Sequence, residues 1–297
     1  MTMKTLWQFS RPHTILGSIC SVVTLYILAT SGHVAQHYIL LILTLIASLA
    51  CNVCIVGLNQ IIDVHLDKIN KPNLPLAAGT MLMATAHNIV VLCGILAVVV
   101  GFVASTYLGW LIVVITAIGY IYSVPPIQLK RHHLPAAISI TLVRGLLVNL
   151  GMYIHFRYAL YGIHWQVALP QYIWPLTAFI AAFSVAIAWF KDLPDTEGDA
   201  AYNYKTLAIV YSKKVALWGG SLMVSTAYLY CIYWCYRYDV AVHGYYLLIS
   251  HIVLLLLFLL NIASVSSNPA SIKPFYLRFW VLFFAEYIVY AVWAVYM

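Results

Sequence analysis

Long apolar runs alternate with short polar connections along almost the whole chain. About 20 apolar residues, rising about 1.5 Å each, cross the hydrocarbon core of a bilayer as a helix. Nine runs meet or approach this length, and the spans that they predict are 14–31, 38–62, 86–105, 108–122, 134–155, 170–190, 214–236, 243–264 and 275–296. The fourth is short, which favours a tilted or partly interfacial helix. The pattern predicts an all-α, polytopic membrane protein.

No connection between the spans is long enough to bury a core of its own. We therefore expect residues 1–297 to form a single integral-membrane domain. The composition agrees with this prediction, because 64% of the residues are hydrophobic and only 8% are charged. Six cysteines lie within the apolar runs without the spacing of a zinc site or a secreted disulfide framework, so we expect them to pack as small hydrophobic side chains.

The basic residues are distributed asymmetrically between the two sides of the predicted membrane. Of the 15 Lys and Arg residues, eleven lie at the amino end or in the connections after even-numbered spans. Only Arg157 and Arg237 lie on the opposite side, while Arg144 and Arg278 fall inside spans. Basic connections stay in the cytoplasm, so the amino terminus is predicted to be cytoplasmic. The net charge of +7 then reflects a lipid-bilayer partner, and no nucleic-acid partner is predicted.

Six of the eight acidic residues fall in two short patches. In the first patch, Asn59, Asp63 and Asp67 are spaced four apart, which places them on one stripe of a helix. Such a set of hard oxygen ligands suits Mg²⁺, which completes its coordination with water and substrate phosphate. A solvated helix end is the alternative interpretation. It is weakened here because the chain avoids charge almost everywhere else.

The second patch follows the sixth span and contains Asp192, Asp195 and Asp199. Their spacing of three and four predicts one helical face, although Pro194 favours a kink or a new turn. Both patches follow even-numbered spans and should therefore lie on the same, cytoplasmic side. We expect their carboxylates to face one another across a cavity and to hold Mg²⁺ there.

Basic residues accompany both patches, namely Lys68, Lys71, Lys130, Arg131 and Lys191. Carboxylates and Mg²⁺ ringed by cations suit a phosphorylated ligand, whereas transport of a bare ion needs no cationic rim. Membrane anchoring is an equally good interpretation of Lys130 and Arg131. Arg144 lies inside a span, so it must face the bundle interior and find a partner there. Asn149 either shares its cavity or forms a hydrogen bond between helices.

Several motifs resemble those of the UbiA superfamily of membrane prenyltransferases. They are N-x-x-x-D-x-x-x-D with the following N-K-P and L-P-L-A-A-G, the loop Y-S-x-P-P-x-x-L-K-R, and D-x-x-D-x-x-x-D. Within that superfamily, W-Q-F-S-R-P-H-T at 7–14, V-R-G-L-L-V-N-L-G at 143–151 and F-K-D-L-P-D-T-E-G-D at 190–199 resemble homogentisate prenyltransferases. The resemblance runs from residue 7 to about residue 214, and the last three spans carry no such motif.

The resemblance implies a nine-helix bundle whose central cavity opens sideways to lipid under a roof of cytoplasmic loops. It implies that metal ligands come from Asp63, Asp67, Asp192, Asp195 and Asp199. It implies that the diphosphate is bound by Asn59, Lys71, Lys130, Arg131, Arg11, Ser123 and Arg144. Tyr122 and Ser123 would lie by the reacting carbon, and Asp63, Asp67, Asp195 and Tyr122 would be the catalytic residues. Many family members have arginine in place of Lys71.

The implied reaction is Mg²⁺-dependent transfer of a prenyl group, phytyl by resemblance, from its diphosphate to homogentisate with decarboxylation. Other aromatic acids, such as 4-hydroxybenzoate or a naphthoate, are alternative acceptors. A cation-coupled transporter is an alternative from another class, but it would place its carboxylates at mid-membrane and show internal repeats. A phospholipid-forming phosphotransferase would need a D-G-x-x-A-R motif, which is absent. His65 is a candidate acceptor contact or, more simply, a loop histidine.

Overall fold

A computed structural model describes residues 2–31, 37–163, 169–238, 244–265 and 271–296 of the chain. Within these ranges the protein is helical, with no strand. Nine helices there are long and apolar enough to cross a membrane: α2 (Pro12–Ala29), α3 (Tyr38–Ile62), α5 (Met83–Ala104), α6 (Thr106–Ser123), the run His133–Tyr161, α9 (Ile173–Phe190), α12 (Lys213–Tyr238), α13 (Gly244–Ala263) and α14 (Ile272–Tyr296). The predicted nine-span, all-α architecture is confirmed. The fourth span is longer than predicted, because Ser105 caps α6 by accepting a hydrogen bond from the Leu108 N–H.

Helix α9 lies at the centre of the bundle and is buried along most of its length. It packs against α12 and against the run His133–Tyr161. It is apolar on all sides, and its exposed residues, Trp174 and Ala178, lie towards its amino end. The Phe183 ring stacks on Phe279 of α14, with ring centroids 3.9 Å apart. A second layer pairs α3 with α5, and α2 packs against both α3 and α14.

The fifth span consists of α7 (His133–Ile140), a π-helical segment η3 (Thr141–Gly151) and α8 (Met152–Tyr161). Two carbonyls of this segment receive hydrogen bonds in addition to the i→i+5 bonds of the π-helical backbone. Asn149 supplies them, since its Nδ2 donates to the carbonyl oxygens of Arg144 at 3.0 Å and Gly145 at 2.9 Å. Its Oδ1 accepts a hydrogen bond from the Tyr287 hydroxyl of α14. Asn149 therefore forms the hydrogen bond between helices that was one of its two predicted roles.

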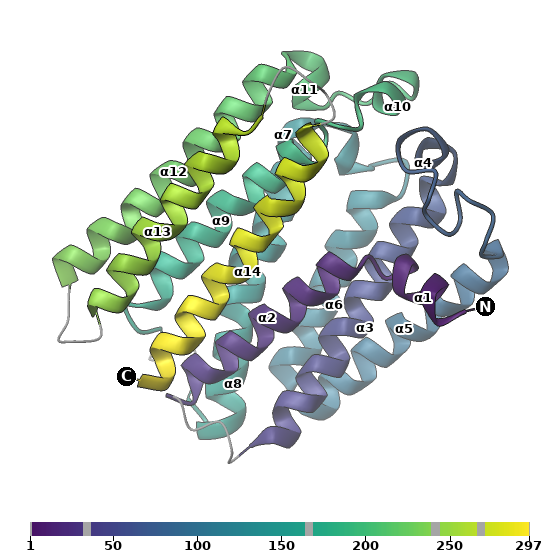
Figure 1. Cartoon of the computed structure of the whole chain (residues 1–297). Helices are drawn as coiled ribbons and strands as arrows, with labels where there is room; N and C mark the ends of the chain where they lie inside the picture. The colour runs from purple at the N-terminus through teal and green to yellow at the C-terminus, as the bar shows by residue number, and fades with distance from the viewer. Residues whose placement is uncertain (1, 32–36, 164–168, 239–243, 266–270, 297) are drawn as a thin grey trace.

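The remaining helices are short and gather at one end of the bundle (Figure 1). They are α1 (Met3–Phe9), α4 (Val64–Asn70), the 3₁₀ turn η2 (Leu129–Arg131), α10 (Thr196–Ala201) and α11 (Leu207–Val210). Backbone hydrogen bonds join two of the loops, because Lys205 N–H donates to the Arg131 carbonyl and His133 N–H donates to the Lys205 carbonyl. The two acidic patches lie at this end.

Candidate functional site

The first acidic patch spans a bend between two helices. Helix α3 ends at Ile62, and Asp63 joins it to α4 with φ −95° and ψ 11°. The four-residue backbone spacing nevertheless continues, because Asp63 N–H donates to the Asn59 carbonyl and Asp67 N–H donates to the Asp63 carbonyl, at 2.9 and 2.7 Å. The predicted stripe of Asn59, Asp63 and Asp67 therefore survives, although on a bent rather than an uninterrupted helix.

The second acidic patch does not form the single helical face that its spacing predicted. Helix α9 ends at Phe190, Asp192 lies in the following turn, and Asp195 is the residue before α10. Pro194 has no N–H and therefore cannot continue the helix. The chain turns there and brings Asp192, Asp195 and Asp199 to the same place by a different route from the predicted one.

Both patches line one cavity of about 610 Å³, here called the polar cavity. Five nearly buried carboxylates belong to its wall: Asp63, Asp67, Asp192, Asp195 and Asp199. Its basic residues are Arg11, Lys71, Lys130, Lys191 and Lys273, and further polar groups come from Asn59, Asn70, Tyr122, Tyr204 and Tyr276. The predicted convergence of the two patches is thus a feature of the structure.

Asn70 connects the two patches directly. Its Nδ2 donates to Asp199 Oδ1 at 3.1 Å, and its Oδ1 accepts from the Gly198 N–H at 2.9 Å. A Cβ on Gly198 would lie 2.4 Å from Asn70 Oδ1. Only glycine therefore allows α10 to approach α4 this closely.

Three lysines of the polar cavity form ion pairs with its carboxylates. Lys130 Nζ lies 2.6 Å from Asp63 Oδ1, and Lys71 pairs with Asp195. Lys191 Nζ lies 3.5 Å from Asp192 Oδ1 and also donates to the Tyr122 hydroxyl at 2.9 Å. These pairs hold the ammonium groups at the cavity wall, next to the carboxylates of both patches.

Burial keeps several of these carboxyl groups partly protonated near neutral pH. Burial, with a smaller contribution from neighbouring carboxylates, raises the pKa of Asp192 to about 6 and that of Asp199 to about 7. Burial also raises the pKa of Asp67. Burial alone would lower the pKa of Lys191, but Asp192, Tyr122 and Asp199 together outweigh it and raise that pKa well above its ordinary value. The cavity wall thus carries five carboxyl groups, some of them partly protonated, and five basic residues.

The donor set fits a divalent cation with oxygen ligands. Asp67 Oδ2 is buried and has no hydrogen-bond partner among the described residues. An orphaned carboxylate oxygen is costly unless a cation or a proton satisfies it. Together with Asp63, Asp192, Asp195 and Asp199 it offers the hard oxygen ligands that Mg²⁺ prefers.

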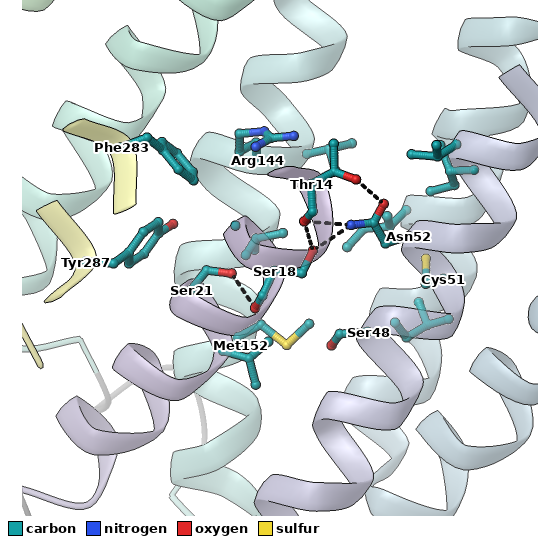
Figure 2. Close-up of a pocket in the computed structure, with 18 residues that line it drawn as sticks. Thr14, Ser18, Ser21, Ser48, Cys51, Asn52, Arg144, Met152, Phe283 and Tyr287 are labelled. Atoms are coloured by element: carbon teal, nitrogen blue, oxygen red, sulfur yellow. Dashed lines mark hydrogen bonds between the residues drawn. The ribbon is translucent and has the colours of Figure 1, made fainter. Parts of the chain in front are cut away.

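Ten of the thirteen residues predicted to form the site line the polar cavity, and Arg131, Ser123 and Arg144 do not. Arg131 instead donates to the Tyr202 carbonyl at 3.1 Å and stacks over the Tyr204 ring. Ser123 is completely buried. Arg144 lines a second cavity of about 190 Å³ deeper among the spans, here called the inner cavity (Figure 2). Arg131 and Arg144 therefore lie outside the polar cavity, whereas the resemblance implied that both bind the diphosphate.

Other residues of the polar cavity were not predicted as site residues: His13, Asn70, Tyr204, Lys273 and Tyr276. Asn70 belongs to the N-K-P motif, so the sequence held a signal for it. Lys273 and Tyr276 come from α14, where no motif indicated a role. His65 is exposed and does not line the cavity, in agreement with its simpler interpretation as a loop histidine.

The polar cavity reaches the outer surface of the bundle along α14. Leu277 lines the cavity and is 63% exposed, and the neighbouring Lys273 is exposed as well. On a membrane-spanning helix, an exposed leucine faces lipid. This geometry agrees with the sideways opening implied by the resemblance.

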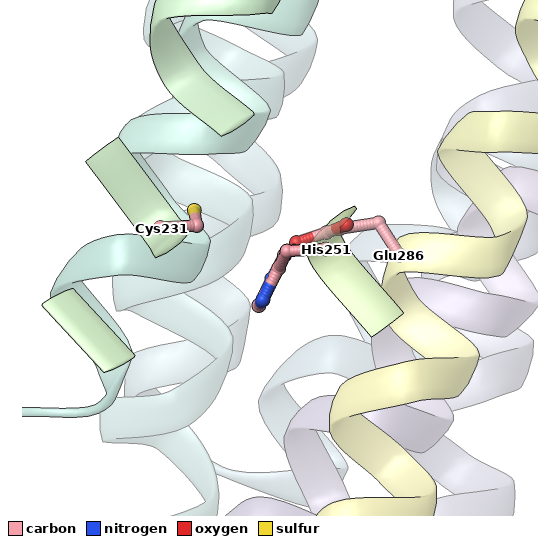
Figure 3. A group of neighbouring side chains, drawn as sticks. All are labelled: Cys231, His251 and Glu286. Carbon is pink, nitrogen blue, oxygen red and sulfur yellow. The ribbon is translucent and has the colours of Figure 1, made fainter. Parts of the chain in front are cut away.

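A buried polar cluster lies elsewhere, between α12, α13 and α14 (Figure 3). His251 Nε2 lies 3.0 Å from Glu286 Oε1, and candidate ligand atoms of Cys231, His251 and Glu286 all lie within 4.8 Å of one another. Cys235 Sγ lies 3.9 Å from His251 Nδ1. Cys231 and Cys235 therefore contact polar groups, whereas the sequence predicted that they pack as small hydrophobic side chains. The cluster lines neither the polar nor the inner cavity.

The fold and the polar cavity together define a polytopic helical membrane protein with an aspartate- and lysine-rich site at one end of its bundle. A family model, the UbiA prenyltransferase family, matches residues 18–284, and the chain belongs to this family. It is 40% identical over 300 residues to homogentisate phytyltransferase from Synechocystis sp., covering 98% of this chain and 96% of that protein.

Further comparisons agree with the family assignment. The chain is 32% identical over 292 residues to the chloroplastic homogentisate solanesyltransferase of Arabidopsis thaliana, covering 96% of this chain and 75% of that protein. Its fold resembles that of a UbiA homolog from Archaeoglobus fulgidus bound to DMAPP and Mg²⁺, with a TM-score of 0.65. That similarity covers 97% of this chain and 99% of the other at 14% identity, so it concerns the fold.

Proposed function

We propose that this protein transfers a phytyl group from phytyl diphosphate to homogentisate, with loss of the acceptor's carboxylate as CO₂. The observation that carries the proposal is the convergence of both aspartate patches on one cavity, in a chain so similar to homogentisate phytyltransferase. A diphosphate needs dense positive charge, and a metal held by carboxylates beside lysines provides it.

Arg11, Lys71 and Lys130 are the residues that we expect to bind diphosphate oxygens. In the structure, Lys71 and Lys130 are paired with Asp195 and Asp63. A bound diphosphate would replace these carboxylates as the partner of each lysine and leave the carboxylates free to bind a cation. When bound by the five aspartates, Mg²⁺ supplies the positive charge that stabilises diphosphate as a leaving group.

Aromatic residues line the same cavity and face the developing allylic cation. Tyr122 and Tyr276 line the cavity, and aromatic rings attract cations; Lys191 Nζ already lies over the Tyr122 ring, 5.6 Å from its centroid. Lys191 holds the Tyr122 hydroxyl at 2.9 Å and so orients that ring. As the allylic C–O bond breaks, its electron pair leaves with diphosphate, and a ring carbon of homogentisate forms the new C–C bond. That carbon loses a proton, and the methylene left by CO₂ takes one up.

A cation-coupled transporter is not favoured by the position of the carboxylates. They lie beyond Ile62 and Phe190, at the ends of α3 and α9, and not at the middle of the spans. The asymmetry of Lys and Arg supports our further proposal that this end of the bundle, with the amino terminus, is cytoplasmic.

The test is an assay of the full chain in membranes with radiolabelled phytyl diphosphate, Mg²⁺ and a panel of aromatic acids. We expect prenylation of homogentisate, accompanied by release of labelled CO₂ when its carboxylate is labelled. 4-Hydroxybenzoate and a naphthoate should give little product. Prenylation of either acid in preference to homogentisate, or no prenylation of any, would overturn the proposal.

A further inference from the structure

The inner cavity lies directly next to the polar cavity. His13 of α2 lines the polar cavity, and the next residue, Thr14, lines the inner one. Trp280 of α14 contacts His13, with ring centroids 4.9 Å apart, and also lies against the guanidinium of Arg144. A molecule in the inner cavity therefore lies close to a substrate held by the aspartates and lysines.

Arg144 carries a positive charge into the inner cavity without a carboxylate partner. The ion pairs within the described part of the chain are Lys71–Asp195, Lys130–Asp63, Lys191–Asp192 and His251–Glu286. The contacts of the Arg144 guanidinium are the ring faces of Trp280 at 5.0 Å and Phe283 at 5.4 Å. An arginine inside a membrane span is costly unless an anion compensates it. The two rings compensate part of the charge, and no carboxylate of the described residues pairs with it, so an anionic ligand from outside the protein would complete its environment.

The size and lining of the inner cavity select one chemical class of anion. A cavity of about 150 Å³ holds a benzene ring, so 190 Å³ accommodates one ring with a short side chain. The Ser48 hydroxyl lines the cavity, is 8% exposed and has no hydrogen-bond partner among the described residues. An anionic group for Arg144, a ring beside Phe283 and a hydroxyl for Ser48 together describe a small phenolic carboxylate.

We propose that the inner cavity binds the aromatic acceptor, with Arg144 holding its carboxylate and Ser48 bonding a ring hydroxyl. Guanidinium presents two parallel N–H donors that match a carboxylate, which explains an arginine at this position. The hydrogen bonds from Asn149 to the carbonyls of Arg144 and Gly145 fix the backbone that carries it. This inference rests on the proposed function, and it assigns Arg144 to the acceptor and not to the diphosphate.

The test separates acceptor binding from turnover. Equilibrium dialysis of the purified full chain with radiolabelled homogentisate, without prenyl diphosphate, measures the Kd for the acceptor. Arg144→Gln should raise this Kd at least about tenfold, because charge-assisted hydrogen bonds are lost. The Kd of Arg144→Lys should lie between that of the unaltered protein and that of Arg144→Gln. The matched control is Arg278→Gln, since Arg278 lies on α14 outside both cavities and bonds Asn261 and Ser264.

Two phenols that differ in charge test whether Arg144 binds the carboxylate of the acceptor. Arg144→Gln should weaken binding of 4-hydroxyphenylacetate but leave that of the neutral 4-ethylphenol within about twofold. The KM for phytyl diphosphate should also stay within that range, which shows that the variant is folded. Equal weakening of both ligands, or an increase confined to the KM for phytyl diphosphate, would overturn the proposal.

The same measurements distinguish this inference from the proposed function. Homogentisate binding that depends on Arg144, without prenyl transfer, would support the inference and contradict the proposed function. If the protein transfers the prenyl group but Arg144→Gln binds homogentisate as tightly as the unaltered protein, the proposed function is supported and the inference is contradicted. If Arg144→Gln does not fold, Ser48→Ala decides the matter, because it should weaken homogentisate binding more than binding of phenylacetate, which has no ring hydroxyl.

Discussion

Two lysines of the polar cavity are held by carboxylates from other parts of the fold. Lys130 of η2 pairs with Asp63 at the end of α3, and Lys71 pairs with Asp195 before α10. The Lys130–Asp63 pair is buried, so removing one partner leaves the other charge uncompensated, whereas Lys71 is partly exposed to solvent. Each aspartate therefore has two roles, as a candidate cation ligand and as the partner of a lysine.

Asp63→Ala should reduce prenyl transfer by at least about 100-fold, the usual magnitude for loss of an electrostatic group in an active site. It removes an oxygen ligand and frees Lys130 from its partner. The measurement is turnover in membranes containing equal amounts of inserted protein. Glu197→Gln is the control, since Glu197 lies within the second acidic patch but is exposed and lies outside the cavity. Substantial turnover by Asp63→Ala with Mg²⁺ present would exclude the metal assignment.

The pH should change the Mg²⁺ requirement. The pKa values of Asp192 and Asp199 are about 6 and about 7, so both groups gain protons as the pH falls through that range. A cation must displace these protons before it binds. We expect the Mg²⁺ concentration for half-maximal activity to rise as the pH falls from about 8 to about 6. A pH-independent Mg²⁺ requirement would contradict the proposal that these carboxyl groups bind the metal, and chelation by EDTA should abolish activity throughout.

At the scale of elements, the site is made by the ends of helices that are distant in sequence. Helices α4 and α10 contact each other through Asn70 and Gly198, 128 residues apart. This contact fixes the separation of the two aspartate patches. It also means that a residue without any chemical function can control whether both patches reach the same ligand.

Gly198→Ala should lower activity by about tenfold or more. Alanine favours helix by about 1 kcal/mol over glycine, so the substitution does not destabilise α10 by itself. Its Cβ instead collides with Asn70 and displaces α10 from α4. Activity and thermal stability are measured together, with Ala200→Ser on the exposed side of α10 as the control. Full activity of Gly198→Ala would show that the spacing of the patches is not critical.

The sequence predicted the spans and most of the site because both depend on local pattern. Apolar run length defines a span, and the four-residue spacing of Asn59, Asp63 and Asp67 persists through the bend. The turn at Pro194 was foreseen only in part, because proline ends a helix without determining where the chain goes next. Tyr276 was not predicted as a site residue, and the cavity that Arg144 lines was not predicted, because both depend on how α14 and the π-helical segment pack against distant helices.

At the scale of the whole molecule, the last three helices are joined by the cluster of Cys231, His251 and Glu286. All three side chains are completely buried. Apolar packing alone gives little specificity inside a bilayer, because lipid tails are as apolar as the side chains. A polar contact among α12, α13 and α14 therefore fixes their relative positions, and α14 in turn carries walls of both cavities.

Glu286→Ala should destabilise the protein by about 3 kcal/mol, since it leaves His251 buried without its partner. The resulting fall in the thermal unfolding midpoint is measured in detergent or lipid. Glu286→Gln keeps the shape of the side chain and an oxygen that accepts a hydrogen bond, so it should lose less stability than Glu286→Ala. The KM for each substrate should stay unchanged, because the cluster lies outside both cavities. An altered KM with unchanged stability would instead assign the cluster a role in binding.

The exposed position of Leu277 on the cavity wall has a consequence for the donors that the protein accepts. A closed pocket acts as a ruler, because a chain that is too long collides with its floor. Here the far end of the isoprenoid can extend past Leu277 among the acyl chains of the bilayer. We therefore expect farnesyl, phytyl and much longer diphosphates to react with similar kcat, so that the supply of donors in each membrane determines which product accumulates.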